Sequence, residues 1–133
     1  MPPNLEEINT LKNKAKNYFI LGVIAQKIGM NSESATNFFK SLFATDDAFL
    51  LEKTNFQPSN HTERFEMLKT AMPSLYLITD KLFSTYRRTY TSELEKEEIN
   101  LVKKRIMEAF ANVGISIPTD EDIKTKLKEL SKK

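Results

Sequence analysis

Apolar residues recur every three or four positions through most of the chain, which is the spacing of one face of an α-helix. The first such stretch follows Asn4, a residue type that caps helices, and Gly29 ends it. Its apolar positions are Leu5, Ile8, Leu11, Ala15, Phe19 and Gly22. Between Tyr18 and Ala25 the apolar face widens to nearly the whole circumference. We therefore expect this helix to be buried on more than one side, either inside a bundle or also against a second subunit.

A second helix is predicted to begin at Asn31 or Ser32, since both residue types are good caps. Its apolar positions are Ala35, Phe38, Phe39, Leu42, Phe43, Phe49 and Leu50. Asp46 lies on or beside this stripe, so its carboxylate needs a partner if it is buried. The following segment, 53–60, contains Pro58 and is predicted to be a loop.

A short third helix and a longer fourth helix follow this loop. Asn60 and Glu63 have the spacing of a capping box, which marks a helix start. Pro73 suits the first turn of the fourth helix. The apolar stripe of the fourth helix consists of Leu75, Ile78, Leu82 and Tyr86.

The fourth helix is predicted to end near Tyr90, because Ser92 and Glu95 again have capping-box spacing. A fifth helix should then begin at once and continue to Gly114. Its inward residues are Val102, Ile106, Ala109, Phe110 and Val113.

After an extended bridge, a final amphipathic helix is predicted over about 119–131, on the rim of the bundle. The connections between the predicted helices are short, and short connections join antiparallel neighbours. We therefore predict an all-α fold in which residues 1–133 form one antiparallel bundle of five to six helices.

The composition agrees with a helical protein and excludes several kinds of site. Among 133 residues there are three glycines and no cysteine, so disulfides and thiolate metal sites are ruled out. His61 is the single histidine, which excludes a cluster of histidine ligands within one chain. The adjacent carboxylates Asp46 and Asp47 are too few to hold a hard cation. We expect neither a metal nor a cofactor.

The charge and hydropathy patterns indicate a cytoplasmic protein. The net charge is +2, and the longest apolar run, Tyr18 to Ala25, is far shorter than the ~18 residues that a membrane helix needs. The acidic start of the chain has no signal-peptide pattern. Phosphate-binding, metalloprotease and nucleophile-elbow motifs are absent from the sequence.

The stretch from Ser84 to Glu93 contains two arginines between two tyrosines. In helical phase, Arg87 shares a face with Phe83 and Tyr90, whereas Arg88 lies on a polar face. We therefore expect Arg87 to point toward protein and to form a structural clasp with Asp46 or Asp47, because a guanidinium matches a carboxylate edge. The alternative is that Arg87 lies along the bundle edge with its stem on Phe83 and Tyr90.

The order of these parts resembles a HEPN-domain protein, a helical bundle named for its presence in higher eukaryotes and prokaryotes and for nucleotide binding. The similarity spans about 10–112 and rests on the segments NKAKNYFILGVIAQ, SESATNFFKSLFATDDAFLLE, QPSNHTERFEML and PSLYLITDKLFSTYRRTY. The resemblance implies a two-fold dimer, which the apolar face from Tyr18 to Ala25 could form. It also allows a minimal nucleotidyltransferase as a partner.

Catalytic HEPN proteins resemble one another in an Arg-x4–6-His motif that cleaves RNA across a dimer interface. The motif arginine corresponds to Arg87 or Arg88 here, but 92–95 reads Ser-Glu-Leu-Glu and supplies no histidine. Metal-independent cleavage needs a proton acceptor near neutral pH, which histidine provides and tyrosine does not. His61 is the other candidate for a catalytic role.

Three functions follow from this resemblance. The first is a non-catalytic module that binds nucleotide, RNA or a partner protein at a cleft near Arg87 and Tyr90, with Arg88 and Tyr86 as further ligand contacts. The second is a metal-independent endoribonuclease, such as a toxin of a toxin–antitoxin pair, with a degenerate site. The third is a structural partner of a nucleotidyltransferase.

Overall fold

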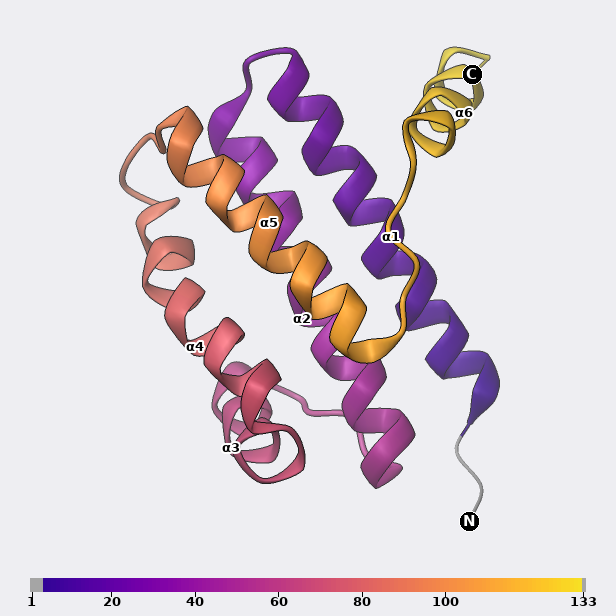
Figure 1. The fold of residues 1–133 in the computed structure, drawn as a ribbon, viewed down its shortest axis with the longest axis vertical. Helices are drawn as coiled ribbons and strands as arrows, with labels where there is room; N and C mark the ends of the chain where they lie inside the picture. The colour runs from indigo at the N-terminus through magenta and orange to yellow at the C-terminus, as the bar shows by residue number, and fades with distance from the viewer. Residues whose placement is uncertain (1–3, 133) are drawn as a thin grey trace.

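A computed structural model describes residues 4–132 of the chain. In this range it is all-α, with six helices and no strand (Figure 1). The helices are α1 (Leu5–Lys27), α2 (Asn31–Thr54), α3 (His61–Ala71), α4 (Pro73–Arg88), α5 (Lys96–Val113) and α6 (Asp120–Ser131). An all-α bundle was predicted, and the structure confirms it.

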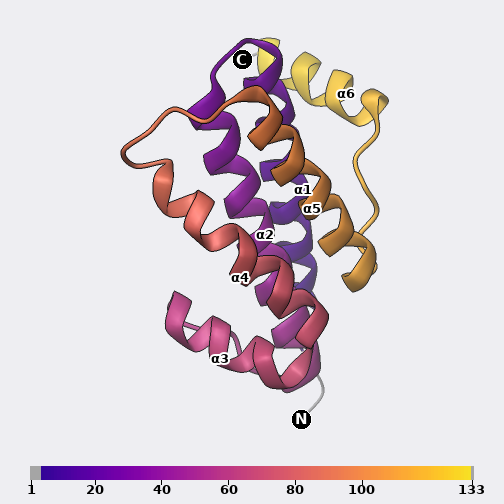
Figure 2. The ribbon, with the colours of Figure 1, turned by 60° about the vertical axis from the view of Figure 1, so that its left-hand side comes forward.

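The two long helices α1 and α2 form an antiparallel hairpin and make the most extensive contact in the molecule. Helix α5 packs on α2, and α4 lies beside α5 on the outside (Figure 1). Helix α3 contacts α2 and α4 at one end of the bundle, as both views show (Figure 2). Helix α6 contacts α1 and projects away from the other helices, so it lies on the rim, as predicted.

Local capping residues fix most helix ends at the predicted places. The Asn4 side chain accepts a hydrogen bond from the Glu7 backbone N–H at 3.1 Å, and Asn60 caps α3 in the same way at 2.9 Å. Pro73 occupies the first turn of α4. The Thr119 side chain caps α6. Each of these ends depends on residues within one turn, which is why the sequence reveals them.

The junction between α4 and α5 differs from the prediction. Helix α4 ends at Arg88, and α5 begins only at Lys96, with Glu95 as its N-cap and Glu98 completing the capping box. The predicted box of Ser92 and Glu95 is therefore wrong. The extended chain before Glu95 carries Leu94 into the core, where it is 2% exposed. Burial of this leucine favours the later start.

Helices α1 and α2 approach closely because small residues line their contact. A Cβ atom added to Gly22 would lie 2.6 Å from ring atoms of Phe38, which is closer than real contacts allow. The Ser34 hydroxyl donates to the Gly22 carbonyl at 2.7 Å, and the Ser41 hydroxyl donates to the Ala15 carbonyl at 2.6 Å. These buried hydroxyls are thus satisfied by the facing helix.

The wide apolar face of α1 is covered mainly within the chain. From Tyr18 to Ala25, Leu21 alone is exposed, at 37%. The face contacts α2, and Ile20 also lines the contact with α6. Most of this face is therefore buried by the chain's own helices, and the dimer contact expected there stays a prediction. No helix within 4–132 has the length and apolar character that crossing a bilayer requires.

Candidate ligand-binding site

A buried ion pair between α2 and α3 anchors the site. The Arg64 guanidinium donates to both carboxylate oxygens of Asp47, from Nε to Oδ1 at 2.7 Å and from Nη2 to Oδ2 at 3.0 Å. The two residues are 8% and 7% exposed. This two-point contact uses the planar fork of arginine fully and fixes α3 against α2.

The clasp predicted between Arg87 and Asp46 or Asp47 is therefore wrong. Arg87 is exposed and makes no ion pair with any residue in 4–132. It lies in the last turn of α4, where the helix has already passed the buried aspartates of α2. Helix α3 packs against this part of α2 instead, and Arg64 from its first turn supplies the guanidinium.

Asp46 is buried beside this pair but has a different partner. Its Oδ2 accepts a hydrogen bond from the Thr79 hydroxyl of α4 at 2.8 Å, while Oδ1 is buried without a partner in 4–132. Burial raises the pKa of Asp46 well above 3.8, although Thr79 and Arg64 oppose the shift. The side chain therefore favours its protonated, neutral form, because a charge is costly without full solvation.

The predicted site residue His61 belongs to the same network. Its Nδ1 lies 2.6 Å from Nη1 of Arg64. Because a guanidinium can only donate, Nδ1 must be the acceptor and the ring proton must be on Nε2. Partial burial, followed by the charge of Arg64, lowers the pKa of His61 from 6.5. His61 is thus a neutral ring that presents an N–H donor.

Aromatic rings surround His61 and form a continuous surface with it. The centroid of its imidazole lies 4.7 Å from that of Phe43, 5.3 Å from Phe83 and 5.8 Å from Tyr86. Phe65 extends the group through an edge contact with Phe83 at 5.0 Å. We call this half-exposed surface the aromatic face; it consists of Phe43, His61, Phe65, Phe83, Tyr86 and Tyr90.

Tyr86 and Tyr90 form the outer part of the aromatic face. Their hydroxyl oxygens are 2.8 Å apart, and their ring centroids are separated by 5.6 Å. This hydrogen bond, together with burial, raises the pKa of Tyr86 to about 12. Tyr90 is 74% exposed, which is unusual for so large a ring. The Tyr86 hydroxyl therefore stays protonated, and the ring face of Tyr90 is accessible to a ligand.

The two arginines of the predicted site have different environments. Arg88 donates to Glu98 of α5 at 2.8 Å and 3.4 Å, so its guanidinium is already occupied. Arg87, which precedes Tyr90 by three residues, is exposed and free of ion pairs within the described chain. The structure thus gathers Tyr86, Tyr90 and His61, leaves Arg87 free beside them in sequence, and directs Arg88 to α5.

In the network of Asp47, Arg64 and His61, the sequence indicated Asp47 and Arg64 only weakly. Asp47 was predicted as one of two possible partners of Arg87, whereas Arg64 was not among the predicted site residues. The available signal was its position three residues after His61, because residues three apart are neighbours on a helix surface. Within 4–132, no three carboxylate or imidazole side chains gather in a metal-ligating group.

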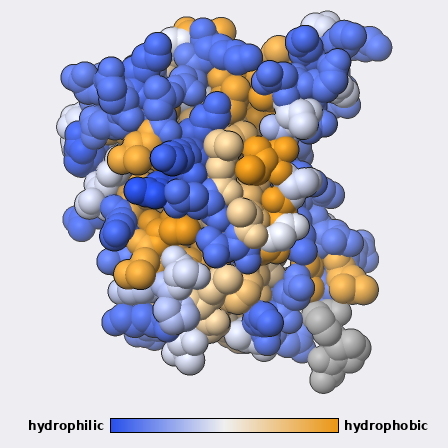
Figure 3. All heavy atoms as spheres, in the orientation of Figure 1, coloured by the Kyte–Doolittle hydropathy of each residue, from blue (hydrophilic) through white to orange (hydrophobic). Residues whose placement is uncertain are grey.

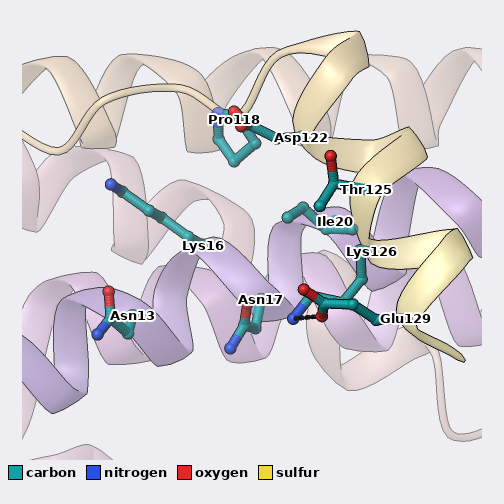
Figure 4. A pocket seen from close by; sticks show the side chains of 9 residues that line it. All are labelled: Asn13, Lys16, Asn17, Ile20, Pro118, Asp122, Thr125, Lys126 and Glu129. Atoms are coloured by element: carbon teal, nitrogen blue, oxygen red, sulfur yellow. Dashed lines mark ion pairs between the residues drawn. The ribbon is translucent and has the colours of Figure 1, made fainter.

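A separate cavity of about 350 Å³ lies between α1 and α6, away from the predicted site residues (Figure 4). Its lining residues are Asn13, Lys16, Asn17, Ile20, Pro118, Asp122, Thr125, Lys126 and Glu129. Lys126 and Glu129 pair at 3.3 Å within α6. The cavity contains no aromatic side chain, so it lacks the stacking surface of the aromatic face.

Comparison with known proteins finds no matching family model, and no match among curated proteins or solved structures. The molecule is therefore described by its own fold and site. It is an all-α bundle with a half-exposed aromatic face over a buried Asp–Arg–His network.

Proposed function

We propose that this protein is a non-catalytic, HEPN-like bundle that binds nucleotides or single-stranded RNA at its aromatic face. The observation that carries the proposal is Tyr90, a ring that is 74% exposed beside Tyr86 and three residues after the unpaired Arg87. Aromatic rings stack on nucleobases of any sequence, and arginine binds phosphate. The residue types thus suit the two parts of a nucleotide.

The construction of the aromatic face supports binding. Tyr86 is fixed from below by edge contacts with Phe39 and Phe43, both at 5.2 Å. Its hydroxyl in turn holds the Tyr90 hydroxyl. A base that stacks on Tyr90 would therefore meet a ring whose position is already restricted, which reduces the entropy lost on binding.

The hydrogen bonding of His61 favours binding over RNA cleavage. A general base needs a free nitrogen lone pair directed at the 2′-hydroxyl proton. In His61 the Nδ1 lone pair is occupied by Arg64, and Nε2 carries the proton. This tautomer can donate to a phosphate or base oxygen but cannot accept a proton. Endoribonuclease activity would require His61 to leave Arg64.

A binding experiment with matched variants tests the proposal. Fluorescence anisotropy with a short labelled single-stranded RNA should show binding by the wild type, weakened by Tyr90→Ala by about 5- to 150-fold and little changed by Tyr90→Phe. Arg87→Ala should weaken binding and reduce the slope of log affinity against log salt by about 0.7. Arg88→Ala is the control, because Arg88 is already paired with Glu98.

Two results would contradict the proposal. Equal affinity of wild type and Tyr90→Ala would remove the stacking contact on which it depends. Cleavage of the RNA by the wild type, abolished in His61→Gln, would establish the endoribonuclease alternative instead.

A further inference from the structure

A shallow apolar groove runs between α4 and α5, on a different side of α4 from the aromatic face. Its volume is about 350 Å³. Its lining residues are Leu77, Ile78, Lys81, Leu82, Thr85, Leu101, Arg105 and Glu108. Leu77 is 53% exposed and Leu101 is 51% exposed, although both are large and apolar. In Figure 3 hydrophobic atoms lie among charged ones where Figure 1 shows these two helices.

The charges of α5 are arranged antisymmetrically around Leu101. Glu97 and Glu98 precede it by four and three residues, while Lys104 and Arg105 follow it by three and four. All four positions lie on the same side of the helix as Leu101, because residues three and four apart are neighbours on a helix surface. An identical helix running in the opposite direction therefore presents the complementary charge at each position.

We propose that a second copy of this chain docks on the groove through a two-fold axis near Leu101. The two α5 helices would cross antiparallel, with Leu101 of each copy against the groove of the other. Glu97 of each copy would then face Lys104 and Arg105 of the second copy. In such an isologous contact, the acidic residues before Leu101 in each copy face the basic residues after Leu101 in the other copy.

Two of these charges have no competing partner inside the chain. Glu98 is held by Arg88 at 2.8 Å, and Arg105 is held by Glu108 at 2.9 Å. Glu97 and Lys104 are exposed and form no ion pair within 4–132. They are therefore the pair that a second copy would join.

The size of the surface predicts a weak, concentration-dependent dimer. Helices of 16 and 18 residues extend roughly 25 Å, and two adjacent helices are roughly 20 Å wide. The face is therefore roughly 500 Å² in projection, at the low end of what specific interfaces bury per partner. We expect dissociation constants in the micromolar range.

Sedimentation velocity from about 1 to about 200 μM tests the inference. The wild type should shift from monomer to dimer, and Leu101→Glu should remain monomeric. Glu97→Lys and Lys104→Glu should each weaken the dimer by about tenfold, and the double charge exchange should restore it. Leu21→Glu is the matched control, because this exposed leucine belongs to the wide apolar face of α1.

Thermal unfolding would show that each variant is folded, as expected for exposed positions. A wild type that stays monomeric throughout the series would overturn the inference, as would a dimer that survives Leu101→Glu but not Leu21→Glu. Failure of the double exchange to recover association would exclude the antiparallel pairing. None of these results bears on binding of a short RNA that spans a single site, since the aromatic face lies outside the groove.

Discussion

The pairing of Arg64 with Asp47 can be tested through its effect on stability. Replacing Arg64 by methionine keeps much of its apolar volume but leaves the Asp47 carboxylate, 9% exposed as a side chain, without its partner. Breaking a buried pair in this way costs about 3–5 kcal/mol. For a chain of 133 residues this lowers the melting temperature by roughly 10–20 °C.

A double-mutant cycle separates the pair from the general effect of each substitution. Arg64→Met, Asp47→Leu and the double variant would be unfolded with urea at pH ~7 and followed by circular dichroism. The double variant should be within about 2 kcal/mol of the wild type, because removing both charges leaves none unpaired. The coupling energy should therefore exceed about 2 kcal/mol.

The more exposed pair of Lys12 and Glu52, with a separation of 3.4 Å, provides the control cycle. Its coupling should be at most about 1 kcal/mol, since water screens it. A coupling for Arg64 and Asp47 no larger than that of the control would refute the conclusion that this pair anchors α3. In Arg64→Met, NMR titration should also show a higher pKa for His61, because Arg64 contributes to lowering it.

Two further variants examine the buried part of the fold. The pKa of Asp46 is raised, so the contribution of its neutral carboxyl group to stability is complete below pH 3.8 and is lost as the pH rises through the folded-state pKa. Asp46→Asn should therefore gain stability relative to wild type as the pH rises above 3.8, and a difference in urea unfolding that stays constant with pH would contradict this. Gly22→Ala should destabilise the protein by about 1–3 kcal/mol, since the new methyl group would meet the ring of Phe38. The control is Asn17→Ala on the exposed side of α1, which should not be destabilising. Equal melting temperatures of the two variants would exclude a rigid contact between Gly22 and Phe38.

The features that the sequence predicted correctly are those decided within one or two helical turns. Asn4, Asn60 and Thr119 cap their helices by accepting a hydrogen bond from the backbone N–H three residues later. Pro73 suits the first turn of α4 because of its own ring alone. The start of α5 shows the limit of such reasoning. Ser92–Glu95 and Glu95–Glu98 have the same spacing, and burial of Leu94 in the core decides between them.

The pairing of the buried aspartates required knowledge that helical phase does not contain. The phase of α4 placed Arg87 toward the protein, but it could not indicate how far along α2 the end of α4 would reach. It also could not indicate that α3 would contact both helices and bring Arg64 to Asp47. From the sequence alone, either Arg64 of α3 or Arg87 of α4 could pair with a buried aspartate. The path of residues 55–60 between α2 and α3 determines that Arg64 does so.

Helix α4 connects the two proposals because it borders both surfaces. Its buried stripe of Leu75, Thr79 and Leu82 faces the bundle. Phe83 and Tyr86 on one flank belong to the aromatic face, and Leu77 on the other flank lines the groove. A dimer through the groove would therefore leave both aromatic faces open and join them in one particle. Two linked sites on one RNA bind more tightly than either alone, because the second contact is intramolecular. If both proposals hold, Leu101→Glu should weaken binding to a long RNA more than to one that spans a single site.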